Sequence, residues 1–82
     1  MDERINLNRE MTDMSTLQPH QRQRVVDEKS ELSERLAKLL AFFQGPVFPT
    51  LSEAERSRLR NQARFMDGYA AVLEERIAAF GP

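Results

Sequence analysis

Apolar side chains recur every seven residues in two long stretches of the chain, with further apolar residues between them. In the first stretch, residues 19–43, the positions are Val25, Leu32, Leu36, Leu39 and Phe43. This spacing predicts one apolar stripe along an α-helix. Pro19 suits the first helical turn, where its missing N–H is not needed. Lys29 interrupts the stripe, and we expect its aliphatic stem to lie along the core while its ammonium group reaches water.

The segment QGPVFPT, which follows the first stretch, carries signals that end a helix. We expect Gly45 to adopt the left-handed conformation common at helix C-termini, and Pro46 prevents the helix from continuing. Val47, Phe48 and Leu51 are apolar for a loop. They are therefore expected to cover the end of the core.

A second helix is predicted from residue 52 to about residue 80. Ser52 and Glu55 have the spacing of a capping box at its start. Its apolar positions are Leu59, Ala63, Met66, Ala70, Leu73, Ile77 and Phe80. Two long helices with a short connection predict an all-α antiparallel hairpin over residues 19–82, with helices at about 19–44 and 52–80 and coiled-coil-like packing.

Residues 1–18 form a separate N-terminal segment. Leu7, Met11 and Met14 have helical spacing, so the segment is either a short third helix or a disordered arm. Met11 and Met14 also leave open a shorter product from an internal start.

The predicted hairpin has more apolar surface than two helices can cover, and a chain of 82 residues builds only a marginal core. Mid-helix Gly68 costs about 1 kcal/mol relative to alanine, which suggests that another backbone approaches it. We therefore expect a homodimer forming a four-helix bundle, or a higher even-numbered oligomer. The predicted interface residues are Phe65, Gly68, Val72, Phe42 and Val26.

The composition excludes several classes of function. The chain has no cysteine and one histidine, so it has neither disulfides nor a thiolate metal site, and no cofactor is expected. Its net charge of −1 provides no overall attraction to nucleic acid or to an anionic membrane. No apolar run is long enough to span a membrane. We expect a soluble, intracellular protein.

No catalytic motif is present. The sequence has no glycine-rich phosphate loop, no nucleophile–base pair and no metal-ligand spacing, so an enzyme is not expected. The carboxylates on the second helix are interpreted as helix-terminal charges and salt-bridge partners. They are Glu53, Glu55, Asp67, Glu74 and Glu75.

Arginine dominates the positive charge, with ten arginines and two lysines. Arg56, Arg60 and Arg64 are spaced four residues apart and form one stripe on a helix, whereas Arg58 lies on a different side. Like charges in a row repel one another, so something is expected to offset them. The alternatives are water, a phosphate-bearing ligand, or acids of the first helix, namely Asp27, Glu28, Glu31 and Glu34.

An aromatic ring beside these arginines would favour a nucleotide ligand, because bases stack on rings. Tyr69, His20 and Phe48 are the available rings, although Tyr69 also suits a core or interface position and His20 a surface position. Only oligomerisation would bring Arg24, His20 or Tyr69 to another chain's arginines. The candidate ligand-binding residues are Arg56, Arg60, Arg64, Arg24, His20 and Tyr69.

The stretches HQRQRVVDEKSELSERLAKLLAFF and PVFPTLSEAERSRLRNQARFMDGYAAVLEERIAAF resemble a group of small helical-hairpin proteins from tailed phages and prophages. The shared frame includes H-Q-x-x-R-V, E-x-x-E-L, M-x-x-Y and L-x-x-R-I-x-x-F, within residues 20–80. The resemblance implies a small accessory phage protein that acts in the cytoplasm of the bacterial host. It carries no site residues over to this chain.

Phage proteins of this kind often counter host defence, which leads to three hypotheses. The first is an oligomeric sponge that binds and sequesters a cyclic-nucleotide-type immune signal without cleaving it, an architecture similar to that of known phage sponges. The second is an inhibitor that binds a host defence protein such as a CRISPR effector. The third is a structural or assembly accessory. DNA binding is disfavoured because acids and bases alternate along both helices.

Overall fold

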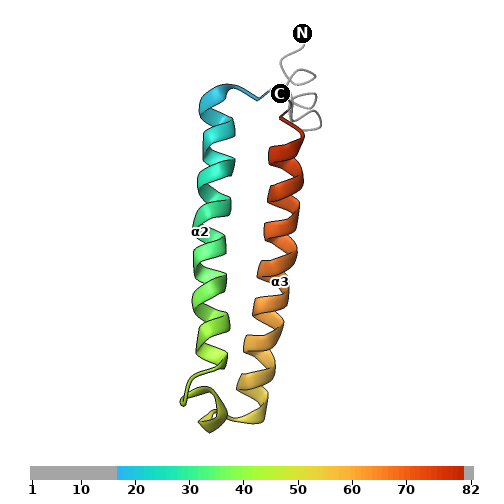
Figure 1. Cartoon of the computed structure of the whole chain (residues 1–82). Helices are drawn as coiled ribbons and strands as arrows, with labels where there is room; N and C mark the ends of the chain where they lie inside the picture. The colour runs from blue at the N-terminus through green and yellow to red at the C-terminus, as the bar shows by residue number, and fades with distance from the viewer. Residues whose placement is uncertain (1–16, 81–82) are drawn as a thin grey trace.

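The computed structural model describes residues 17–80 of the chain. Two long helices, α2 (Pro19–Phe43) and α3 (Glu53–Ala78), run antiparallel and side by side, as Figure 1 shows. The connection between them contains the 3₁₀ turn η2 (Phe48–Thr50). These residues contain no β-strand, so the predicted all-α hairpin is confirmed. The helix or arm predicted near the N-terminus falls on residues 1–16, which lie outside the described part of the chain.

Helix α2 begins at Pro19, as predicted, and ends without the predicted left-handed glycine. The backbone N–H of Gln18 donates to Oε1 of Gln21 at 2.8 Å, which satisfies one donor at the start of the helix. At the other end, Gln44 has φ −90° and ψ −5°, and its N–H donates to the carbonyl of Ala41 at 3.0 Å. Gly45 does not adopt a left-handed φ, so that prediction is wrong. The helix tightens into a final turn instead.

Helix α3 has the predicted N-cap, but the reciprocal half of the capping box is replaced. The Ser52 hydroxyl accepts a hydrogen bond from the backbone N–H of Glu55 at 3.1 Å. The Glu55 carboxylate accepts instead from Nε of Arg58 at 2.9 Å. The helix ends at Ala78, two residues earlier than predicted, where Ala79 caps it by donating to the carbonyl of Glu75 at 3.0 Å.

The core lies along the seam between the two helices, where the seven-residue repeat predicts it. Val25 and Leu32 of α2 are buried, and Leu73 of α3 is fully buried between them. Four partly buried residues of the C-terminal chain half pack against this cluster: Met66, Ala70, Ile77 and Phe80. Few side chains of residues 17–80 are buried, as expected for the marginal core of a two-helix chain.

Lys29 behaves as its place in the stripe predicts. Its side chain is mostly buried, and its Nζ lies 3.3 Å from Oε1 of Glu74 on the facing helix. The stem thus covers part of the seam while the ammonium group forms an ion pair at the surface.

The connection closes one end of the core through its aromatic ring. The Phe48 ring packs 4.7 Å from the Phe43 ring and 6.2 Å from the Phe42 ring, measured between centroids. Leu51 is half-buried. Val47, however, is 51% exposed, so the prediction that it covers the core is wrong.

Candidate functional site

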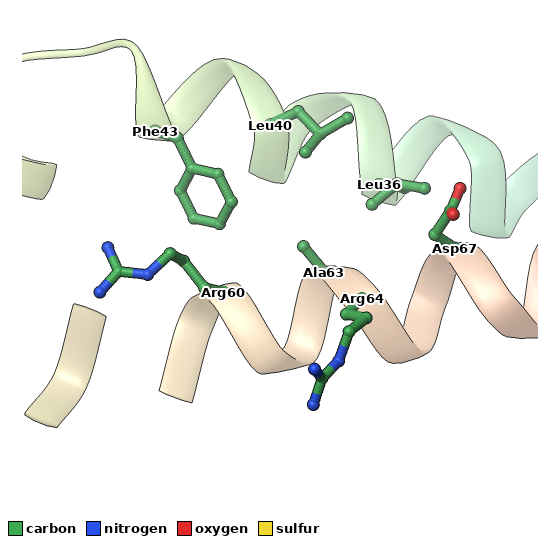
Figure 2. Close-up of a pocket in the computed structure, with 7 residues that line it drawn as sticks. All are labelled: Leu36, Leu40, Phe43, Arg60, Ala63, Arg64 and Asp67. Atoms are coloured by element: carbon green, nitrogen blue, oxygen red, sulfur yellow. The ribbon is translucent and has the colours of Figure 1, made fainter. Parts of the chain in front are cut away.

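A groove opens between the helices near the connecting turn. Its volume is about 410 Å³. Figure 2 shows its walls: Leu36, Leu40 and Phe43 lie on α2, and on α3 the methyl group of Ala63 is the one small apolar side chain among longer charged ones. The groove stays open because the Ala63 side chain is too short to fill the space in front of the larger side chains of α2. The lining residues are Leu36, Leu40, Phe43, Arg60, Ala63, Arg64 and Asp67.

Two of the three stripe arginines lie at this groove. Arg60 lies at its turn end, with its guanidinium carbon 5.8 Å from the centre of the Phe48 ring. The stem of Arg64 lines the groove, but its guanidinium group points away from α2 (Figure 2). It donates to Oδ1 of Asn61 at 3.3 Å and lies 5.4 Å from the centre of the Phe65 ring.

Arg56 is held against its own helix. Its Nη2 lies 3.2 Å from Oε1 of Glu53. Its Nε is shielded from solvent and forms no hydrogen bond within residues 17–80. Arg56 is therefore less available to a ligand than Arg60, whose guanidinium group contacts a ring rather than an acid.

The acids of α2 do not neutralise the positive charge of the arginine stripe. This rules out one of the three ways in which, from the sequence, that charge is expected to be offset. Asp27 accepts from Gln23 at 2.9 Å, and Glu34 lies 4.0 Å from Lys38. Glu28 accepts from the Tyr69 hydroxyl. Within the described hairpin, these α2 acids, together with Glu31, form no ion pair with the stripe, because the part of α2 that faces Arg60 and Arg64 across the groove is its apolar end, Leu36 to Phe43.

Tyr69 lies on the opposite side of the hairpin from the groove. Successive residues of an α-helix turn by about 100°, which places Tyr69 and Arg64 on opposite flanks of the core positions of α3. The hydrogen bond from Tyr69 to Glu28 crosses between the helices on that far side. Within one chain, Tyr69 therefore cannot stack on a ligand bound in the groove.

The pKa of the Tyr69 hydroxyl is raised above its ordinary value of 10.0, mainly by its hydrogen bond to Glu28. Partial desolvation and the negative charge of Glu28 raise the pKa of Tyr69 further, whereas Arg76 lowers it. The hydroxyl therefore stays protonated, and hence a donor, to a higher pH than that of an ordinary tyrosine.

His20 and Arg24 lie near the far end of the hairpin from the groove. Both are exposed on the first turns of α2. Arg24 lies sixteen residues before Leu40, which corresponds to about 24 Å along the helix axis. One chain therefore does not bring these two residues to the arginine stripe.

The predicted interface residues are all exposed in the hairpin. Phe65 is 67% exposed and Val72 is 48% exposed, and both lie on the Tyr69 flank of α3. Phe42 and Val26 are exposed on opposite flanks of α2. Beyond its chain neighbours and the backbone of its own helical turns, a Cβ atom added to Gly68 would meet nothing within 4 Å, so α2 does not approach that glycine.

Asp67 is a groove residue that the sequence interpretation missed. Three of the other carboxylates on α3 form the expected ion pairs, Glu53 with Arg56, Glu55 with Arg58 and Glu74 with Lys29. Asp67 lines the groove instead. Its position seven residues after Arg60 is a signal that could have placed it on the same stripe.

Neither a metal site nor a membrane span is found in residues 17–80. Over this range, no cluster of three or more histidines, cysteines or carboxylates is arranged to hold a metal ion. Neither long helix has an apolar stretch sufficient to cross a lipid bilayer.

Comparison with known proteins identifies one relationship. Searches of curated proteins and of solved structures found no significant match. A family model described as Sequestin matches residues 18–79, which covers both long helices and the turn between them. The chain therefore belongs to the Sequestin family.

Proposed function

We propose that this chain is a phage-encoded anti-defence protein that sequesters a nucleotide-type immune signal in the cytoplasm of the bacterial host. The family name denotes sequestration, which means that a ligand is bound and held. The observation that carries the proposal is the position of Arg60, which lies beside an open apolar groove with no acid paired to it within the described hairpin.

The groove has the chemistry that a nucleotide requires. The Arg60 guanidinium carbon lies over the Phe48 ring, and within residues 17–80 no acid is paired with its N–H groups, so these donors are available to a phosphate. The Phe43 ring and the leucines of the groove offer apolar surface for a base. Arg64 lines the same groove and supplies a second positive charge once its guanidinium group turns inward.

The groove residues favour binding without cleavage. Among the residues that line it, Asp67 is the one carboxylate, and no histidine, serine or cysteine is present to serve as a nucleophile or as its base. Hydrolysis of a phosphodiester would require such a group or a positioned metal ion. We therefore propose that the ligand is released intact.

Oligomerisation completes the site in this proposal. The groove is open to solvent on one side, and a second copy covering it would exclude water and strengthen the arginine–phosphate contacts. Leu40 lines the groove and is 48% exposed, so it provides apolar surface there for a second copy. His20, Arg24 or Tyr69 would then reach the ligand from another copy, in a homodimer or a higher even-numbered oligomer.

Native mass spectrometry and calorimetric titration test the proposal together. The titration uses cyclic dinucleotides, cyclic trinucleotides and ADP-ribose derivatives, and we expect at least one to bind and to be recovered unchanged after the protein is denatured. Arg60→Ala should weaken this binding about tenfold or more, because a charge-assisted hydrogen bond is lost. Arg58→Ala is the matched control, since Arg58 pairs with Glu55. No binding by any of these ligands would sink the proposal.

A second candidate is a protein-binding inhibitor of a host defence complex such as a CRISPR effector. The observation that favours it is the group of exposed apolar residues on the flank opposite the groove, which includes Phe65, Tyr69 and Val72. Such a patch suits a protein partner. Pull-down with the Phe65→Glu variant beside the wild type tests this candidate. It fails if no host protein is retained by the wild type and lost by the variant.

A further inference from the structure

The groove has opposite charges at its two ends, and this arrangement bears on which ligand it accepts. Arg60 lies at the end nearest the connecting turn, and Asp67 lies seven residues later on the same helix. Seven residues of α-helix correspond to about 10.5 Å. Figure 2 shows the Asp67 carboxylate directed toward α2, whereas the Arg60 guanidinium group lies at the Phe43 end.

The Asp67 carboxylate is free to interact with a ligand. It forms no ion pair or hydrogen bond with any residue between 17 and 80, whereas the neighbouring acid Glu74 is held by Lys29. Leu36 of α2 and Ala63 of α3 line the same groove as Asp67. An unpaired carboxylate offers strong acceptor sites to a ligand in the groove.

An ionised carboxylate accepts hydrogen bonds and donates none. A phosphate oxygen is likewise an anionic acceptor, so Asp67 repels a phosphate instead of binding it. The groups that suit Asp67 are hydroxyl and amino donors. A nucleotide has phosphate at one end and ribose hydroxyls or a base amino group at the other. Its phosphate therefore suits the Arg60 end of the groove, and its hydroxyl or amino donors suit the Asp67 end.

We propose that Asp67 is the specificity-determining residue of the groove. It accepts hydrogen bonds from the hydroxyl or amino groups of a nucleoside whose phosphate is held at Arg60, and it rejects anions that consist of phosphate alone. This inference rests on the proposed function and adds to it a rule for ligand choice.

Two probes that differ only in the nucleoside test the rule, namely adenosine diphosphate and inorganic pyrophosphate. Titration of the full chain should show that the wild type prefers adenosine diphosphate by about tenfold or more. Asp67→Ala should reduce this preference about tenfold, by weakening the binding of adenosine diphosphate and strengthening that of pyrophosphate. Asp67→Asn should gain affinity for pyrophosphate while keeping part of its affinity for the nucleotide, because the amide retains one acceptor oxygen.

Glu75→Ala is the matched control, because Glu75 is an exposed acid of the same helix outside the groove. It should leave the preference unchanged, and circular dichroism should show the same helix content for all variants. The inference is overturned if Asp67→Ala keeps the wild-type preference, or if the wild type binds the two probes equally. In either case the proposed function survives provided that a cyclic nucleotide binds through Arg60. If no phosphate compound binds, the function and the inference fail together.

Discussion

The hydroxyl of Tyr69 donates a hydrogen bond to Oε2 of Glu28, which joins α3 to α2 on the side of the hairpin opposite the groove. This contact gives the tyrosine a structural role within one chain. It also holds the Tyr69 ring on the far side of the hairpin from Arg60 and Arg64, the arginines that the proposed nucleotide would contact. A ligand role for Tyr69 therefore depends on a second copy of the chain.

Titration of the Tyr69 hydroxyl provides a direct test of this contact, because the chain contains one tyrosine and no tryptophan. Absorbance of tyrosinate should rise with a midpoint above 10.0, since the hydrogen bond to Glu28 raises the pKa of Tyr69. The bond stabilises the fold below the ordinary pKa and is lost as pH rises through the raised value. Glu28→Gln should move the midpoint back down, and an unchanged midpoint would contradict the contact.

Leu73→Ala should destabilise the hairpin strongly. Leu73 is fully buried against Val25 and Leu32, so its truncation leaves a cavity and costs about 2–5 kcal/mol of unfolding free energy. Urea unfolding followed by circular dichroism measures the loss. Val47→Ala is the control, because the Val47 side chain is 51% exposed and its truncation should have a much smaller effect on the free energy of unfolding. Equal losses from the two variants would show that the core lies elsewhere.

Ser52→Ala should lower the free energy of unfolding by about 1 kcal/mol, because it removes the acceptor for the Glu55 N–H at the start of α3. Ser57→Ala serves as the comparison. Ser57 is exposed within α3, where alanine is the better helix former, so that change should be neutral or slightly stabilising. Thermal unfolding of both variants measures the difference. A Ser52→Ala protein with the same unfolding free energy as the wild type would argue against the cap.

Phe65→Glu should shift the assembly toward the monomer without unfolding the helices. Phe65 is 67% exposed in the single chain, so a charge there is tolerated in the monomer. In an apolar interface the same charge would be buried without a partner, which is strongly unfavourable. Light scattering behind size-exclusion chromatography gives the mass. The interface prediction is wrong at this position if the variant keeps the mass of a wild-type oligomer.

Gly68→Ala separates the stability of the hairpin from that of the assembly. Apart from its chain neighbours and the backbone of its own helical turns, nothing in the described chain lies within 4 Å of the added methyl group, and alanine favours the helix by about 1 kcal/mol. The hairpin should therefore become more stable to urea. If a partner backbone packs on Gly68, as we predict, the methyl group should also weaken association at low protein concentration. Tighter association of the variant would exclude that packing.

The sequence by itself determined the hairpin. The seven-residue repeat identifies the side chains that form the seam, from Val25 to Leu73, because a helix repeats its faces with a fixed period. Pro19 marks the start of α2 because its missing N–H is not needed there, and Ser52 marks the start of α3 through a local hydrogen bond, so neither signal needs a tertiary contact. The helix ends were less well predicted, since Gln44 and Ala79 close them through backbone bonds that ordinary residues also form.

Only the tertiary structure decided which side chains meet across the seam. The arginine stripe and the acids of α2 looked complementary as separate helices, but the antiparallel arrangement leads Glu28 to Tyr69 and leaves Arg60 at the groove. The groove itself depends on a small residue, Ala63, facing wide ones on the other helix. Such matching is set by the rotation and offset of two helices, which the periodicity of each one alone does not fix.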